Sequence, residues 1–150
     1  LNISAETLCF YDTPPYCFHD YIPKRSNQMC LLICENKDIW FNLRKMLYEY
    51  GRSMLWGTVF DGVIYGEGNR ICEDGALTEY TRFLGVNGVR YLYWGDIDRE
   101  GFNIAVRLFR NNPELKIEPF SAAYLQMLER AKQFPKILSD DTRERMEDYS

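Results

Sequence analysis

Two aspartates separated by one residue, Asp96 and Asp98, are the part of the sequence best suited to chemistry. They follow a short apolar and aromatic run that begins at Tyr91, and such a run predicts a buried strand. Alternation along an extended chain would place both carboxylates on one side. Ligands bind at the carboxyl ends of strands in open α/β sheets, and a hard cation such as Mg²⁺ relieves the repulsion between neighbouring carboxylates. The spacing therefore favours a metal site, with an acidic loop that only caps the next helix as the structural alternative.

Another carboxylate, Glu35, directly follows the continuous apolar run at residues 29–34. That run predicts a strand buried on both faces. Apolar residues at helical spacing between positions 39 and 50, with Gly51 at the C-cap position, predict a helix after it. Glu35 is therefore also expected at the carboxyl end of a buried strand, where it would either supply a third carboxylate to the metal or simply face solvent.

The glycines Gly66 and Gly68 follow a second strand region at residues 54–65. They predict either a turn with positive φ or a loop that a phosphate backbone can approach closely. Their spacing matches neither the dinucleotide-binding fingerprint nor the P-loop, which excludes both of those sites. Lys37 and Arg99 flank the acidic residues and would either neutralise a phosphate or pair with the carboxylates.

Strand patterns that alternate with helical patterns predict an α/β fold, with a mainly parallel four-stranded Rossmann-like sheet flanked by helices and joined by right-handed crossovers. We expect residues 28–134 to form this domain. The β-prone segments 7–11 and 16–21, separated by turn residues, predict an N-terminal β-hairpin extension within residues 1–27. The expected strands are 29–34, 54–65, a central strand ending near residue 94, and 116–120, and the expected helices are 39–50, 72–84, 101–111 and 122–134. Residues 135–150 are expected to form a polar helical tail.

Composition limits the classes of protein to which the chain can belong. The 150 residues are 46% hydrophobic, enough for one domain with a real core. A net charge of −4 argues against a simple basic nucleic-acid-binding surface but is compatible with a nuclease whose site is acidic because it holds a metal. The five cysteines lack the spacing of a zinc site or a disulfide framework, which predicts a reducing, cytoplasmic location. No membrane segment is expected, and the two ends predict a fragment of a longer protein.

The order of these pieces resembles the Toprim domain, the catalytic domain shared by topoisomerases, primases and a group of nucleases. A glutamate after the first strand, a glycine loop after the second, and D-x-D-x-x-G between the third strand and its helix make up that pattern. The string Asp98-Arg99-Glu100-Gly101 also resembles the DREG string of type IA topoisomerases, where a glutamate at the position of Glu100 adds a third acid. More narrowly, Glu-Asn-Lys at 35–37 and Tyr-Trp-Gly-Asp-Ile-Asp at 93–98 resemble the C-terminal Toprim domain of the Wadjet JetD family, which is related to topoisomerase VI and to Spo11. The resemblance covers residues 28–134.

This resemblance implies Mg²⁺-dependent DNA strand cleavage in a bacterial defence system against plasmids and phages, with Mn²⁺ as a substitute for Mg²⁺. The metal would stabilise charge on the scissile phosphate and its leaving oxygen, and Glu35 has an alternative role as general acid or base. The implied partners are DNA, other domains of the full-length protein, a second copy in a homodimer and SMC-like subunits of the defence complex. The residues that the resemblance assigns are Glu35, Asp96 and Asp98 for catalysis, the same three with Glu100 for the metal, and Lys37, Gly66, Gly68 and Arg99 for contacts with phosphate or DNA.

Three other functions are compatible with the same residues. One is a Toprim-fold module that binds DNA or a partner without cleaving, and another is a component of a topoisomerase VI-like enzyme. The third is a phosphatase with an aspartate nucleophile, because D-x-D after a buried strand also occurs in haloacid-dehalogenase enzymes. Those enzymes carry Thr or Val where this chain has Glu100, and their motif lies near the N-terminus.

Overall fold

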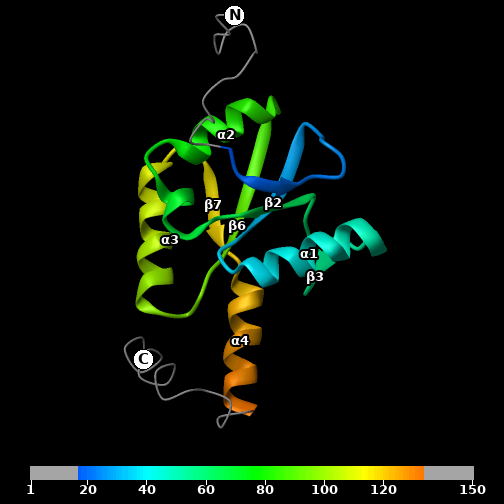
Figure 1. The fold of residues 1–150 in the computed structure, drawn as a ribbon, viewed down its shortest axis with the longest axis vertical. Coiled ribbons are helices and arrows are strands. Elements are labelled where there is room, and N and C mark those ends of the chain that lie inside the picture. Colours follow the sequence, from blue (N-terminus) through cyan, green and yellow to red (C-terminus); the bar gives the residue numbers. More distant parts are fainter. Residues whose placement is uncertain (1–16, 134–150) are drawn as a thin grey trace, which may run out of the picture.

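A five-stranded mixed sheet forms the centre of the protein, seen in a computed structural model that describes residues 17–133 (Figure 1). Four neighbouring strands run parallel, and β1 joins them antiparallel to β5 at one edge. In spatial order the strands are β1 (His19–Tyr21), β5 (Gly62–Tyr65), β2 (Gln28–Cys34), β6 (Gly88–Trp94) and β7 (Lys116–Pro119). The predicted α/β class is confirmed, whereas the predicted sheet of four strands is one strand too small.

The fifth strand comes from the region that we expected to form a separate hairpin extension. β1 occupies part of the predicted segment 16–21 and pairs with β5, so it belongs to the main sheet. The other predicted arm, at residues 7–11, lies outside the described residues, as does the expected tail at 135–150.

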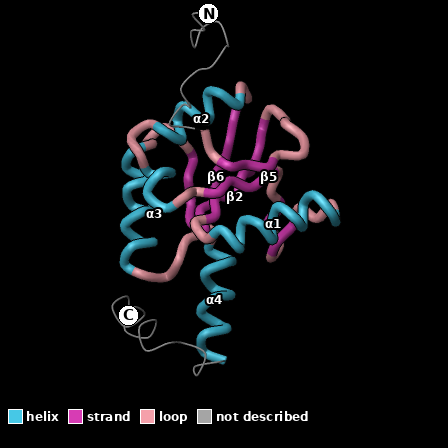
Figure 2. The backbone as a smooth tube through the Cα atoms, in the orientation of Figure 1, coloured by secondary structure: helices cyan, strands magenta, loops and turns pink. Residues whose placement is uncertain are grey.

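Side chains of the central strands alternate between two hydrophobic cores, one on each face of the sheet. In β2, Leu31 and Ile33 enter the core beneath α2 and α3, while Leu32 and Cys34 enter the core beneath α1 and α4. This two-sided burial explains why the strand reads as an unbroken apolar run. Figure 2 shows the strands at the centre and the helices around them, with α4 extending away from the sheet. The helices are α1 (Lys37–Tyr50), α2 (Ala76–Leu84), α3 (Arg99–Asn111) and α4 (Ser121–Gln133).

The helix after β2 ends at the predicted Gly51 and begins at a cap, Asn36, that the sequence analysis did not identify. The Asn36 side chain accepts the backbone N–H groups of Asp38 and Ile39 at 2.9 and 3.1 Å, and Gly51 ends the helix in the left-handed region at φ 58°. Both caps satisfy backbone groups that a helix end otherwise leaves unpaired. They fix where α1 starts, which is two residues after Glu35.

Two predicted elements are subdivided in the structure. Residues 54–65 form a small hairpin, β3 (Met54–Leu55) and β4 (Thr58–Val59), before β5 begins. The helix predicted at 72–84 is a short 3₁₀ helix, η1 (Gly68–Cys72), followed by α2, because Gly75 at φ 68° separates them. Among residues 17–133, no helix combines the length and apolar character needed to cross a bilayer.

Candidate functional site

The predicted acidic residues lie at one edge of the sheet, where three adjacent parallel strands end. The Glu35 N–H donates to the Trp94 carbonyl at 3.0 Å, and the Gly66 N–H donates to the Cys34 carbonyl at 2.9 Å. These bonds extend the strand pairing past the ends of β2, β5 and β6. The loops after the three strands therefore begin side by side, as expected for ligand-binding loops of an α/β sheet.

Glu35 contacts the loop that carries the two aspartates. Its Oε2 atom accepts a hydrogen bond from the Tyr93 hydroxyl at 2.7 Å and from the backbone N–H of Asp96 at 3.4 Å. Burial raises the pKa of Glu35, and the charges of Asp96 and Asp98 raise it further, while the two hydrogen bonds act in the opposite direction. The structure thus brings together the carboxylate after β2 and the acidic loop after β6.

Two glycines allow the acidic loop to lie this close. A Cβ atom on Gly95 would overlap Glu35 Oε2 and would lie 2.5 Å from the Tyr93 hydroxyl oxygen. A Cβ atom on Gly101 would overlap the Asp96 carbonyl oxygen. The Gly95 N–H also donates to the Tyr124 hydroxyl at 2.9 Å, which ties the loop to α4. Close approach of backbone and side chains therefore requires glycine at both positions.

Sequence reasoning placed Tyr93 in the core and missed its role at the site, and it did not single out Tyr124. Tyr93 pairs with Ile33 in the register of β6 and β2, so its ring points to the same face as the side chain two residues beyond Ile33, which is Glu35. The alternation of the two strands was therefore a signal for this contact. No local pattern marks Tyr124, which reaches the loop from a later helix.

Asp98 is the N-cap residue of α3. Its Oδ1 atom accepts the Gly101 N–H at 2.8 Å, so the capping alternative weighed from the sequence is observed. β6 ends at Trp94, and a bend follows at residues 97–98. β6 therefore ends before the two aspartates, and the expectation that both carboxylates lie on one side stays a prediction.

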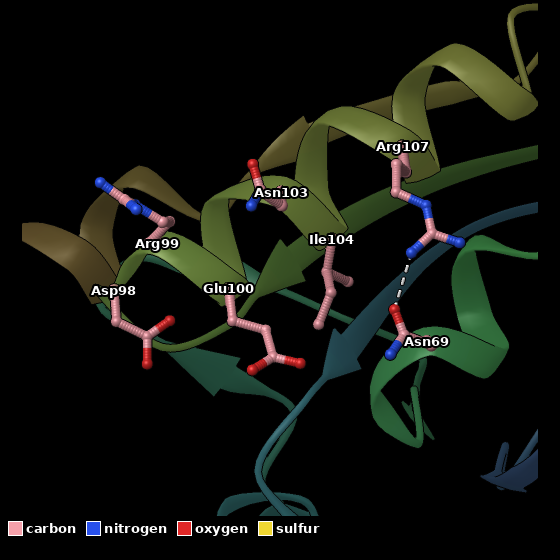
Figure 3. Close-up of a pocket in the computed structure, with 7 residues that line it drawn as sticks. All are labelled: Asn69, Asp98, Arg99, Glu100, Asn103, Ile104 and Arg107. Carbon is pink, nitrogen blue, oxygen red and sulfur yellow. Dashed lines mark hydrogen bonds between the residues drawn. The ribbon is translucent and has the colours of Figure 1, made fainter.

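Asp98 and Glu100 line a pocket of about 460 Å³ between α3 and η1 (Figure 3). Their carboxylates point to the same side of the helix start, whereas the Arg99 side chain points away from them. The other lining residues are Asn69, Asn103, Ile104 and Arg107. Glu100 is thus placed beside Asp98, and Arg99 also lines the pocket.

The remaining predicted contact residues lie along the same edge. Lys37 is the exposed first residue of α1. Gly66 uses its N–H in the extended pairing with β2, while Gly68 has the positive φ of 61° that the turn interpretation requires. Between them, Glu67 also has a positive φ, and its carboxylate lies 2.8 Å from the Arg70 guanidinium.

The donor set fits Mg²⁺ by chemical type, because all four predicted ligands are carboxylates. Within residues 17–133, however, no three acidic, histidine or cysteine side chains are gathered into a ready metal cluster. Mg²⁺ commonly keeps several waters and is held by one or two carboxylates together with substrate phosphates. Asp98 and Glu100, which share a pocket, would be such a pair, with Glu35 and Asp96 next to them.

The fold and the site define an α/β domain with acidic loops at the carboxyl edge of its parallel strands. The family model described as Wadjet protein JetD, C-terminal, matches residues 25–120, which include β2 to β7 and all four predicted acids. The chain belongs to this family of JetD C-terminal domains, which confirms the resemblance read from the sequence. No curated protein and no solved structure gives a significant match.

Proposed function

We propose that this chain is the metal-dependent DNA strand-cleaving domain of a Wadjet defence protein and that its sheet is a Toprim fold. The observation that carries the proposal is the contact between Glu35 Oε2 and the Asp96 backbone. It joins the acid after β2 to the D-x-D loop after β6, although 61 positions separate them in the chain. Membership of the JetD family supports the same function.

Each acidic residue has a distinct part in this proposal. Asp98 and Glu100 would hold Mg²⁺, or Mn²⁺ in its place, with help from Asp96. The bound cation would stabilise the charge that develops on the scissile phosphate and on its leaving oxygen. Glu35 is half-buried and has a raised pKa, so it is suited to exchange a proton with the attacking water or the leaving oxygen. Tyr93 positions Glu35 through the hydrogen bond to Oε2.

DNA is the proposed substrate, and its backbone would pass along the carboxyl edge of the sheet. Lys37, Gly66, Gly68 and Arg99 remain proposed contacts on this edge. Other domains of the full-length protein, a second copy and SMC-like subunits are the proposed protein partners, and the cytoplasm is the proposed location.

A second candidate is a binding module of the same fold that does not cleave. Two observations favour it: Asp98 has a structural role as the cap of α3, and the acids of the described part form no preassembled cluster. In that case DNA or a partner protein would occupy the edge of the sheet and no phosphodiester bond would break.

Asp98→Asn separates the two candidates. Asparagine caps a helix as well as aspartate does, so the variant keeps the fold while it removes one negative charge. Asp74→Asn is the control, because Asp74 is an exposed acid in the loop before α2 and does not line the pocket. The assay is nicking or linearisation of plasmid DNA by the full-length protein with Mg²⁺, together with Mn²⁺ binding followed by electron paramagnetic resonance.

We expect Asp98→Asn to cleave at least ~100-fold more slowly, the order of loss seen when one charge-stabilising group is removed from an active site. Its Mn²⁺ affinity should fall as well, while Asp74→Asn behaves as the unmodified protein. DNA binding without cleavage by the unmodified protein would instead support the binding module. Equal cleavage by Asp98→Asn and Asp74→Asn would remove Asp98 from the mechanism.

A further inference from the structure

The pocket beside the acidic residues also contains a basic side chain that the sequence did not single out. Arg107 lies seven residues after Glu100 on α3, about two helical turns later and on the same face. Its guanidinium donates a hydrogen bond to Asn69 Oδ1 of η1 at 2.7 Å (Figure 3). Carboxylates therefore stand at one end of the pocket and the Arg107 guanidinium at the other.

Among the described residues, the bond to Asn69 leaves the charge of Arg107 without a direct counter-ion. Its hydrogen-bond partner there is a neutral amide, whereas Arg70 and Arg90 form ion pairs with Glu67 and Glu118. A guanidinium carries five N–H donors in one plane, and two of them can donate to the two oxygens of a phosphate or carboxylate at the same time. The amide of Asn69 uses one of these donors and fixes the direction of the group.

Other contacts, in addition to this hydrogen bond, hold the two walls of the pocket together. Ile71 of η1 and Ile104 of α3 belong to the same buried core, and the Asn111 side chain donates to the Cys72 carbonyl at 2.7 Å. The two elements that carry Asn69 and Arg107 are thus fixed against each other before a ligand binds. A preorganised guanidinium loses less side-chain freedom on binding and holds an anion more tightly.

We propose that Arg107, oriented by Asn69, binds a backbone phosphate of the DNA beside the one that reacts. This inference rests on the proposed function and adds a substrate subsite to it. A volume of about 460 Å³ accommodates a phosphodiester group between the two ends of the pocket. The carboxylates at the other end would repel the phosphate by themselves, so a divalent cation there and the guanidinium here would act on the same stretch of backbone. Recognition of this kind positions the strand and carries no sequence preference.

The test compares Arg107→Gln with Arg110→Gln, which removes the same charge from an exposed position on the same helix outside the pocket. A second variant, Asn69→Asp, keeps the arginine but gives it a counter-ion. The full chain is titrated with a short fluorescein-labelled DNA duplex in Ca²⁺ at several salt concentrations, and binding is followed by fluorescence anisotropy. Mn²⁺ binding is measured on the same samples by electron paramagnetic resonance.

Arg107→Gln is expected to weaken duplex binding roughly 10-fold or more, the value of a hydrogen bond to a charged group. The slope of log affinity against log salt should decrease by about 0.9, as for the loss of one phosphate contact. Asn69→Asp should show the same two changes, and Arg110→Gln should show neither to that extent. Mn²⁺ affinity in the absence of DNA should not fall in Arg107→Gln.

Unchanged affinity and slope in both Arg107→Gln and Asn69→Asp would overturn the subsite, and so would a full chain that binds no duplex. The subsite and the cleavage proposal fail in different ways. If Asp98→Asn binds Mn²⁺ normally and cleaves normally while Arg107→Gln loses duplex binding, the subsite stands and the proposed metal site is wrong.

Discussion

Replacement of Gly95 by alanine tests whether the contact between Glu35 and the acidic loop is as close as the structure shows. The added methyl group would lie 2.5 Å from the Tyr93 hydroxyl oxygen and 2.8 Å from Cε1 of the same ring, and it would overlap Glu35 Oε2. The Glu35 side chain can rotate away, but the Tyr93 ring is only 1% exposed and lies within the core. The backbone at Gly95 must therefore shift, or the hydrogen bond between Tyr93 and Glu35 must break.

The expected cost is the sum of two effects. Forcing a methyl group into a packed site costs about 1–3 kcal/mol of unfolding free energy. Loss of the hydrogen bond from Tyr93 to a half-buried carboxylate adds roughly 1–2 kcal/mol. Because the two effects share atoms they will not add fully, and we expect a total of about 2–4 kcal/mol.

Gly66→Ala is the matched control, since Gly66 occupies the equivalent place after β5. A Cβ atom there meets its nearest neighbours, side-chain carbons of Ile33 and Ile71, at ordinary distances of 3.4 Å, and its φ is not positive. Urea titrations followed by tryptophan fluorescence give both unfolding free energies. If Gly95→Ala is no less stable than Gly66→Ala, the packing around Glu35 is looser than described and the reasoning fails.

Three further predictions concern the acidic residues and the ligands proposed for them. Gly101→Ala should cost about 1–3 kcal/mol in urea unfolding, because its methyl group would overlap the Asp96 carbonyl oxygen, and it should weaken Mn²⁺ binding with it. In the metal-free protein, the pKa of Glu35 in the folded state is raised above its ordinary value of 4.5. Between pH 4.5 and this raised pKa, the native state therefore binds more protons than the unfolded state. Stability should therefore fall as the pH rises through that window, and Glu35→Gln should remove this slope in thermal unfolding scans. Finally, duplex DNA should raise Mn²⁺ affinity, and Mn²⁺ should raise duplex affinity by the same factor, in paired titrations; independence of the two would argue against a shared phosphate.

Local patterns predicted the elements whose signals are complete within a few residues. The apolar run at 29–34 is β2, and the helix after it ends where Gly51 predicted, whereas it begins two residues before the predicted start because Asn36 caps it. The predicted helix at 72–84 was too long because one glycine, Gly75, takes a left-handed conformation that a helix cannot include. Trp56 has a φ of 46° in the hairpin after α1, a conformation that is rare for a bulky residue and has no sequence signal.

The candidate site was predictable in its positions but not in its contacts. Strand ends that carry Glu35 and Asp96 are expected to meet if β2 and β6 are neighbours, and in the structure they are. Which atoms meet depends on the register of that pairing and on Tyr93, a residue whose aromatic character reads as core. Arg107 was missed for a related reason: its place in the pocket depends on how α3 packs on η1, which no local motif encodes.

The acidic residues at this edge of the sheet differ in their contribution to the stability of the fold. Asp98 stabilises α3 as its cap, whereas Glu35 caps no helix and lies half-buried, where burial raises its pKa. A half-buried carboxylate with a shifted pKa, placed beside other acids, is a candidate for a chemical role. Because both carboxylates accept hydrogen bonds from within the protein, the fold should persist without metal. In the proposed site the acids would bind a cation and Arg107 would bind a phosphate, and the opposite charges of these two ligands would attract each other.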